Sequence, residues 1–106
     1  MFATIRRYTP KGTVPGNGME EVGRLIRDGF APLVREIPGF HSYYCVNVRD
    51  RELVTVSVFE TSEGGAESTR RASKFVRESK LPFELNPPEV LEGEVIASAE
   101  SQLGVR

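Results

Sequence analysis

The chain has 106 residues, of which 39% are hydrophobic and 27% charged, and these values are typical of one globular domain rather than of a disordered segment. Its 14 basic and 15 acidic side chains give a formal net charge of −1, which argues against nucleic acid or an anionic membrane surface as a partner. The single cysteine excludes an internal disulfide and a cysteine-rich zinc site. The sequence has no signal segment and no apolar run long enough for a membrane span, so we expect a cytoplasmic protein.

The first half of the chain predicts a strand and a helix. Residues 2–9 are rich in aromatic and β-branched side chains, and a segment crowded with Pro and Gly follows them. Apolar residues then recur at three- and four-residue spacings over 18–36, with Asn17 and Glu20 placed as a capping box. Pro32 lies inside this helical pattern and predicts a kink or break there.

The second half predicts a hairpin, a second helix and a last strand. Residues 40–48 and 52–60 are rich in aromatic and β-branched side chains and are separated by a short charged turn. Ser62 is placed to cap a helix over 63–79, which has one thin apolar stripe. A loop with three prolines leads to the strand predicted over 89–99.

This order predicts an α+β, ferredoxin-like βαββαβ fold, a four-stranded antiparallel sheet with two helices on one face. We expect a single domain over 1–106, with its core in 1–99 and a frayed tail over 100–106. Along 52–60, Val54, Val56 and Val58 point one way, and the apolar Leu53 and Phe59 point the other. Both faces of the sheet therefore carry apolar bulk, which predicts a homodimer with the two sheets packed face to face.

Three short motifs at these positions resemble the antibiotic biosynthesis monooxygenase (ABM) family. They are Pro38-Gly39-Phe40 before the second strand, Ser42-Tyr43-Tyr44 within it, and Val58-Phe59-Glu60 at the end of the third. The resemblance covers about residues 1–99 and implies a dimeric α/β barrel with a pocket between sheet and helices in each subunit. The ABM family includes cofactor-independent oxygenases that convert aromatic polyketide phenols to quinones, haem-degrading relatives, and members without known activity.

Two departures from that family bear on the chemistry. The third strand ends in Phe59 where active members often have Trp, and the sequence has no Trp. The haem-degrading branch has an Asn on the first strand and a His on the second helix, whereas Thr4-Ile5-Arg6 and Ser68-Thr69-Arg70 stand here. A haem site is disfavoured because the axial ligand is missing.

His41 and Arg7 are the predicted catalytic residues. His41 is the one side chain that titrates near neutral pH without perturbation, so it is the natural base for a phenol, although a local structural role is the alternative. Arg6 and Arg7 lie on a strand expected to be central, where a buried guanidinium needs an acidic partner, Glu92 or Glu94, or an anionic ligand. In the functional version, Arg7 holds a substrate oxygen in the cavity on the helix side.

Five residues are predicted to form the walls of the substrate pocket. Tyr43 and Tyr44 are adjacent on a strand, so only one of them can face the helices. Core packing is the alternative reading for both tyrosines and for the two phenylalanines. The predicted set is Tyr43, Tyr44, Ser57, Phe59 and Phe75.

The sequence therefore predicts a cofactor-independent monooxygenase that acts on a small aromatic, phenolic substrate. A dimer that binds a small hydrophobic ligand without turnover is the alternative, and a decarboxylase or isomerase that uses His41 is a third possibility. No metal site is expected, because the sequence has no dense His, Asp or Glu cluster, and no nucleotide cofactor, because it has no glycine-rich phosphate loop.

Overall fold

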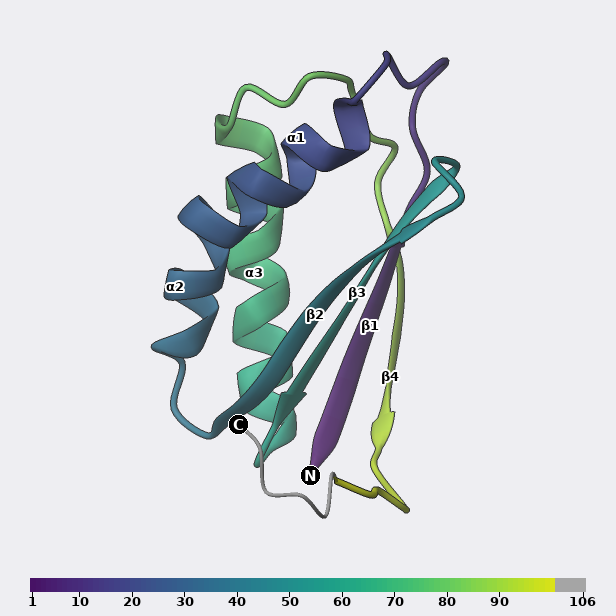
Figure 1. Ribbon diagram of the computed structural model, residues 1–106. Helices are drawn as coiled ribbons and strands as arrows, with labels where there is room; N and C mark the ends of the chain where they lie inside the picture. Colours follow the sequence, from purple (N-terminus) through teal and green to yellow (C-terminus); the bar gives the residue numbers. More distant parts are fainter. Residues whose placement is uncertain (101–106) are drawn as a thin grey trace.

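The computed structural model describes residues 1–100 and has the predicted element order (Figure 1). Its strands are β1 (Phe2–Tyr8), β2 (Phe40–Val48), β3 (Glu52–Phe59) and β4 (Glu89–Glu94). They form one antiparallel sheet in the order β2-β3-β1-β4. The α+β, ferredoxin-like prediction is confirmed, with β1 in a central position; most of the predicted tail lies outside the described residues.

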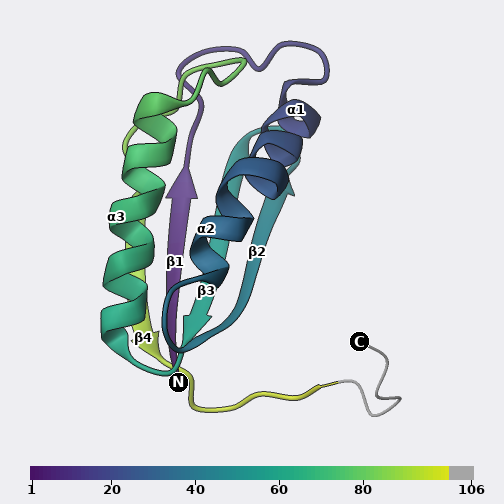
Figure 2. The ribbon, with the colours of Figure 1, turned by 90° about the vertical axis from the view of Figure 1, so that its left-hand side faces the viewer.

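The helices cover one face of this sheet (Figure 2). The first helical segment consists of α1 (Gly18–Leu25), a π-helical turn (Ile26–Phe30) and α2 (Ala31–Arg35). The second is α3 (Ser62–Glu78). In Figure 2, α3 lies on the β1–β4 side and the first segment on the β2–β3 side.

The π-helical turn is where the predicted interruption of the first helix occurs. The amide of Ala31 donates to the carbonyl of Ile26, five residues back, instead of four. The next residue, Pro32, has no amide hydrogen with which to donate to Asp28. The helix thus accommodates the proline by widening one turn ahead of it.

Three predicted details of the element ends are wrong. Asn17 precedes α1, but its side chain forms no capping hydrogen bond. Ser62 is already within α3, and Thr61 occupies the capping position, also without a side-chain bond. The last strand ends at Glu94, the partner of Phe2 at the start of β1, rather than at residue 99; one further backbone bond joins the Val95 amide to the Met1 carbonyl (2.8 Å).

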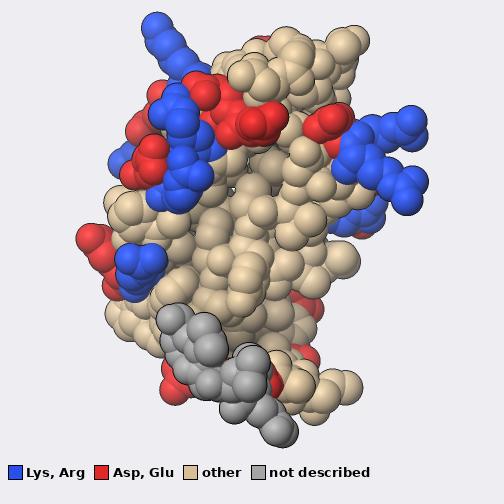
Figure 3. Space-filling view, in the orientation of Figure 1, with Lys and Arg blue, Asp and Glu red and all other residues tan. Residues whose placement is uncertain are grey.

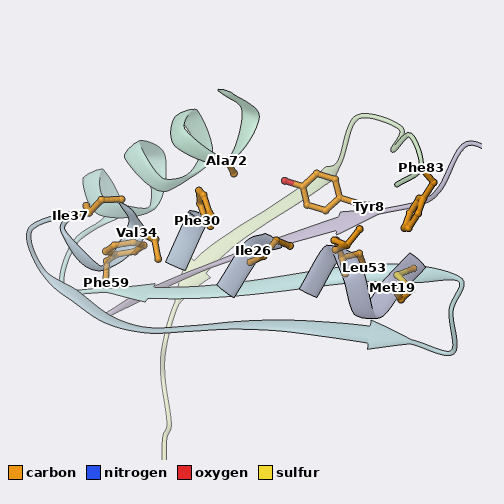
Figure 4. Close-up of a cluster of buried hydrophobic side chains, with 11 residues drawn as sticks. Tyr8, Met19, Ile26, Phe30, Val34, Ile37, Leu53, Phe59, Ala72 and Phe83 are labelled. Atoms are coloured by element: carbon orange, nitrogen blue, oxygen red, sulfur yellow. The ribbon is translucent and has the colours of Figure 1, made fainter. Parts of the chain in front are cut away.

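The hydrophobic core fills the space between the sheet and the helices (Figure 4). Along β3, buried and partly exposed residues alternate, as predicted. The same alternation on β1 directs Thr4, Arg6 and Tyr8 towards the helices. In Figure 4 the hydroxyl of Tyr8 points towards α3.

The face of the sheet opposite the helices is apolar and open. Tyr44, Val46 and Leu91 are exposed there, at 62%, 46% and 48%. Figure 3 views the sheet from its β2 edge rather than onto this face; charged side chains gather there over the helices and at one edge of the view, while the middle, where Figure 1 places β2, is nearly free of charge. The expectation of apolar side chains on both faces of the sheet is confirmed.

A β-bulge interrupts the pairing of β2 with β3 at His41. Phe40 pairs with Phe59, and the next pair is Ser42 with Val58, so His41 is an extra residue in β2. The bulge places Phe40 and Tyr43 on the same side of the sheet, which a regular strand would not do for residues three apart.

No helix within residues 1–100 combines the length and the apolar character that crossing a membrane requires.

Candidate functional site

A small cavity lies between the sheet and the helices. Its walls are mainly aliphatic and aromatic side chains, among them Ile26, Phe30 and Phe75. Polar groups reach it from the sheet, from Arg6, Tyr8, Tyr43 and Thr55. The cavity measures about 20 Å³, roughly the space that one water molecule requires. An aromatic ligand could enter only if some of these side chains moved.

A wider groove adjoins the cavity. It measures about 490 Å³ and runs between α3, the end of β1 and the segment 85–90. Four residues border both spaces: Arg6, Tyr8, Val76 and Leu85. Lys11 and Arg77 also line the groove, and no carboxylate of residues 1–100 does so. The groove is therefore a positively charged approach to the cavity.

Arg6 is the central polar residue of this site. Its side chain is fully buried, at 0% exposure. One terminal nitrogen donates to the hydroxyls of Ser68 (3.1 Å) and Thr69 (3.0 Å), and the other donates to Ser57 Oγ (3.1 Å). Its Nε has no hydrogen-bond partner. All three acceptors are neutral, so the guanidinium charge is not balanced by an ion pair with any described residue.

The close approach of α3 to β1 brings these hydroxyls to Arg6. A Cβ atom on Gly65 would collide with Thr4 Oγ1, and one on Gly64 would lie 2.6 Å from the ring of Phe59. Only glycine leaves room for the first turn of α3 at this distance. Ser68 then follows one turn later, where its hydroxyl also donates to the Gly65 carbonyl (2.7 Å).

Two tyrosines present their rings to the cavity. Burial raises the pKa of Tyr43 well above the usual range of a phenol, and burial also raises the pKa of Tyr8, against the opposing charge of Arg6. Tyr43 packs edge-to-face on Phe30, with ring centroids 5.5 Å apart. Both phenols are neutral near pH 7 and can donate or accept hydrogen bonds there, but neither is a base.

The predicted position of Arg7 is wrong. Its side chain is 47% exposed on the open face and pairs with Glu52 (3.0 Å) and Glu89 (3.1 Å). Alternation along β1 places neighbouring residues on opposite faces, so the arginine in the cavity is Arg6. The predicted acidic partners, Glu92 and Glu94, bind neither arginine.

His41 has the kind of local contact that the structural alternative predicts. The imidazole lies outside the cavity and the groove, is 43% exposed, and its Nε2 is 2.7 Å from Glu60 Oε2. The side-chain hydrogen bond with His41 lowers the pKa of Glu60. The β-bulge makes His41 an extra residue near the start of β2, an edge strand of the sheet. A catalytic role for His41 stays a prediction.

The predicted pocket walls divide into three groups. Tyr43 and Phe75 border the cavity, and Ser57 reaches the site through its bond to Arg6. Tyr44 faces the open side of the sheet. Phe59 is fully buried beside Phe40 and does not border the cavity. The prediction that only one of the two tyrosines faces the helices is confirmed, and the binding roles of Tyr43, Ser57 and Phe75 stay predictions.

Sequence reasoning missed Arg6 and Thr55 as parts of the site. The two residues pair directly across β1 and β3 on the helix side. Thr55 Oγ1 is buried without a hydrogen-bond partner. The signal was present in the alternation of β1, where Arg6 shares a face with Thr4 and Tyr8. Within residues 1–100, no group of three or more His, Cys, Asp or Glu side chains is arranged to hold a metal ion.

Comparison with known proteins identifies the fold. No family model matches the sequence, and no curated protein matches it. Among solved structures, a monooxygenase from the gene ActVA-Orf6 of Streptomyces coelicolor, in complex with nanaomycin D, is similar at a TM-score of 0.69 and 20% identity, over 95% of this chain and 92% of that one.

Two further structures extend the comparison. SnoaB, a cofactor-independent oxygenase from Streptomyces nogalater, has a TM-score of 0.59 at 15% identity, over 94% of this chain and 97% of that one. A dimeric ferredoxin-like protein from an uncultured marine organism has a TM-score of 0.68 at 12% identity, over 94% and 98%.

Proposed function

We propose that this chain, which has the fold of antibiotic biosynthesis monooxygenases, is a cofactor-independent monooxygenase for a small phenolic aromatic compound. One observation carries the proposal: a cavity lined by aromatic side chains contains a buried arginine whose charge no described carboxylate balances. The relatives named above support the same chemistry, although fold alone does not carry function.

The proposed reaction needs no bound redox group, because the substrate itself reduces oxygen. The phenol loses two hydrogen atoms and gains one oxygen atom, which gives a quinone, and the second atom of O₂ leaves as water. The protein's part is to hold the ionised ring in a dry cavity beside a positive charge. Arg6 takes the place predicted for Arg7 as the partner of the substrate oxygen.

Oxygen uptake tests this function. The metal-stripped protein is assayed with anthrone, naphthol and catechol compounds, and incorporation of labelled oxygen from ¹⁸O₂ into the product is followed by mass spectrometry. We expect uptake that depends on the protein, falls at least tenfold in Arg6→Met and is unchanged in Arg7→Met. The second variant removes the same charge from the opposite face of the same strand and is the matched control.

The alternative is a ligand-binding protein without turnover. It is favoured by the absence of an imidazole or carboxylate from the cavity lining among residues 1–100. A bound aromatic compound that copurifies with the protein and survives in air would support this alternative over the oxygenase. Oxygen uptake equal in the wild type and in Arg6→Met would count against the role of Arg6, and the absence of protein-dependent uptake would count against the oxygenase.

We also propose that the protein acts as a homodimer through the open face of the sheet. The exposed Tyr44, Val46 and Leu91 form an apolar surface of the kind that proteins usually cover. The related ferredoxin-like protein is described as dimeric.

The proposed location is the cytoplasm, which suits the free thiol of Cys45.

A further inference from the structure

The charge on Arg6 has no counterion in the described part of the chain. A guanidinium has five N–H donors and keeps its positive charge in proteins. Three donors are used by neutral hydroxyls, of Ser57, Ser68 and Thr69, and Nε is left without a partner. A fully buried charge in this state is unfavourable unless an anion approaches it.

The cavity beside Arg6, at about 20 Å³, has room for an oxygen atom of such an anion, and the aromatic ring of the anion would require that the wall side chains move. Arg6 borders both the cavity and the groove, and Thr55, whose buried hydroxyl also has no partner, borders the cavity with it. Arg6 and Thr55 pair directly across β1 and β3 and both line the cavity, so their free donors are available to an oxygen that enters it. The aromatic rings of Phe30, Tyr43 and Phe75 supply the rest of the cavity wall.

The charges along the approach favour the same class of ligand. Lys11, Arg77 and Arg6 line the groove, and no described acidic side chain does so. A cleft lined by one sign of charge raises the local concentration of ligands of the opposite sign. Neutral and cationic aromatics would gain nothing from this arrangement.

We propose that Arg6 and Thr55 form a subsite for the oxygen of an aromatic phenolate, so that the ligand binds as its anion and gives its proton to the solvent rather than to a side chain of this protein. This inference deepens the proposed function and rests on it for the aromatic class of the ligand. It explains how a phenol can be activated in a cavity in which no described His, Asp or Glu is placed as a base.

A chromophoric phenol, 4-nitrophenol, provides the test, because its phenolate has its own visible absorption band. Its ionisation is titrated spectroscopically, free and bound to the intact protein. We expect a bound pKa at least one unit below the free value, since a positive charge within about 4–6 Å shifts an acid by about 1–3 units. We expect 4-nitroanisole, the methyl ether, to bind at least tenfold more weakly.

The apparent dissociation constant gives a second readout from the wild-type protein alone. The ionised phenol binds more tightly than the neutral one, so we expect the constant for 4-nitrophenol to rise about tenfold for each pH unit between the pKa of the free compound and that of the bound compound, and to level off below the bound pKa. The constant for 4-nitroanisole should not change over the same range. Equal affinities for the two compounds at all pH values would overturn the proposal.

Variants assign the effect to Arg6. Arg6→Met should abolish the shift in the bound pKa, Arg6→Lys should retain part of it, and Arg7→Met should retain all of it. Thr55→Val removes the second donor while preserving side-chain shape. This variant tests the subsite if Arg6→Met does not fold. Equal shifts in the wild type and in Arg6→Met would reject the subsite, as would an unshifted wild type; if Arg6→Met does not fold, equal shifts in the wild type and in Thr55→Val would reject it. A shifted pKa without oxygen uptake would leave the subsite standing and reject the oxygenase.

Discussion

Arg6 and Arg7 show how much one step along a strand changes the environment of a residue. Arg7 lies in solvent between Glu52 and Glu89, and exposed ion pairs of this kind add little to stability, commonly about 0–1 kcal/mol. Arg6 is completely buried among hydroxyls. A buried charge without a counterion is costly for folding, so its presence is better explained by a ligand than by stability.

The adjacent residues Tyr43 and Tyr44 predict a pH effect. Burial holds the pKa of Tyr43 well above that of a free phenol, which is about 10. The folded protein therefore keeps this proton at a pH where the unfolded chain has lost it. The contribution of Tyr43 to stability is complete below about pH 10 and is lost as the pH rises beyond that value.

Urea unfolding between pH 8 and 11 checks this effect. Burial also raises the pKa of Cys45 to about 11, so all proteins in the series carry Cys45→Ala. We expect Tyr43→Phe to lose part of the alkaline fall in the free energy of unfolding, while Tyr44→Phe, on the opposite face, retains it. The same slope in both variants would contradict the assignment to Tyr43.

At the level of single residues, the sequence predicted that neighbouring residues of a strand lie on opposite faces of the sheet. It did not predict which of two neighbouring polar residues faces the helices. The spacing required that Tyr43 and Tyr44 separate, and they do. The choice between Arg6 and Arg7 depended on the acceptors Ser68 and Thr69, which lie more than 60 residues away in the chain. The extra residue at His41 was not predicted, because a bulge is invisible to strict alternation.

At the scale of the elements, the distance between α3 and β1 depends on Gly65. An alanine there would place its Cβ against Thr4 Oγ1, and overpacking of this kind costs about 1–3 kcal/mol. We expect Gly65→Ala to lower the free energy of unfolding by that amount. Because the helix must move away from Arg6, we also expect weaker binding of 4-nitrophenol.

Gly23 supplies the matched control within α1. A Cβ atom at this position would meet no other atom within 4 Å, so Gly23→Ala should stabilise the protein by about 0.5–1 kcal/mol through helix propensity alone. Urea unfolding of both variants measures the difference. If both glycine variants stabilise the protein, the close approach of α3 to β1 does not depend on glycine at position 65.

The sequence predicted the existence and order of all elements but not all of their ends. Apolar periodicity places the bodies of the helices, and β-branched runs place the strands. The end of β4 depends instead on where β1 begins, since Glu94 pairs with Phe2. The π-helical turn was foreseen only as an interruption, because Pro32 breaks a bond without specifying how the helix responds.

For the molecule as a whole, the open face of the sheet predicts self-association. Tyr44 is 62% exposed on this face. A charged side chain there should therefore change the stability of a monomer little, but it should strongly destabilise a face-to-face dimer. We expect the wild type to be a dimer and Tyr44→Glu a monomer in light scattering at micromolar concentration.

Leu33 on α2 is the control for this experiment. It is an exposed apolar residue, at 40%, but it lies on the helical side of the molecule. Leu33→Glu should leave the dimer intact. A monomeric wild type, or dissociation in both variants alike, would contradict an interface on the open face.

The bulge at His41 also determines where the length of the chain can vary. Residues 42–48 pair with β3 without using the extra residue. The side chain of His41 forms a hydrogen bond with Glu60, which is exposed. Deleting His41 would give β2 a regular ladder in which Phe40 lies two positions from Tyr43, so the two side chains would still share a face. Relatives one residue shorter at this point would therefore keep both the cavity wall from Tyr43 onwards and the pairing of Phe40 with Phe59, and would lose the contact between His41 and Glu60.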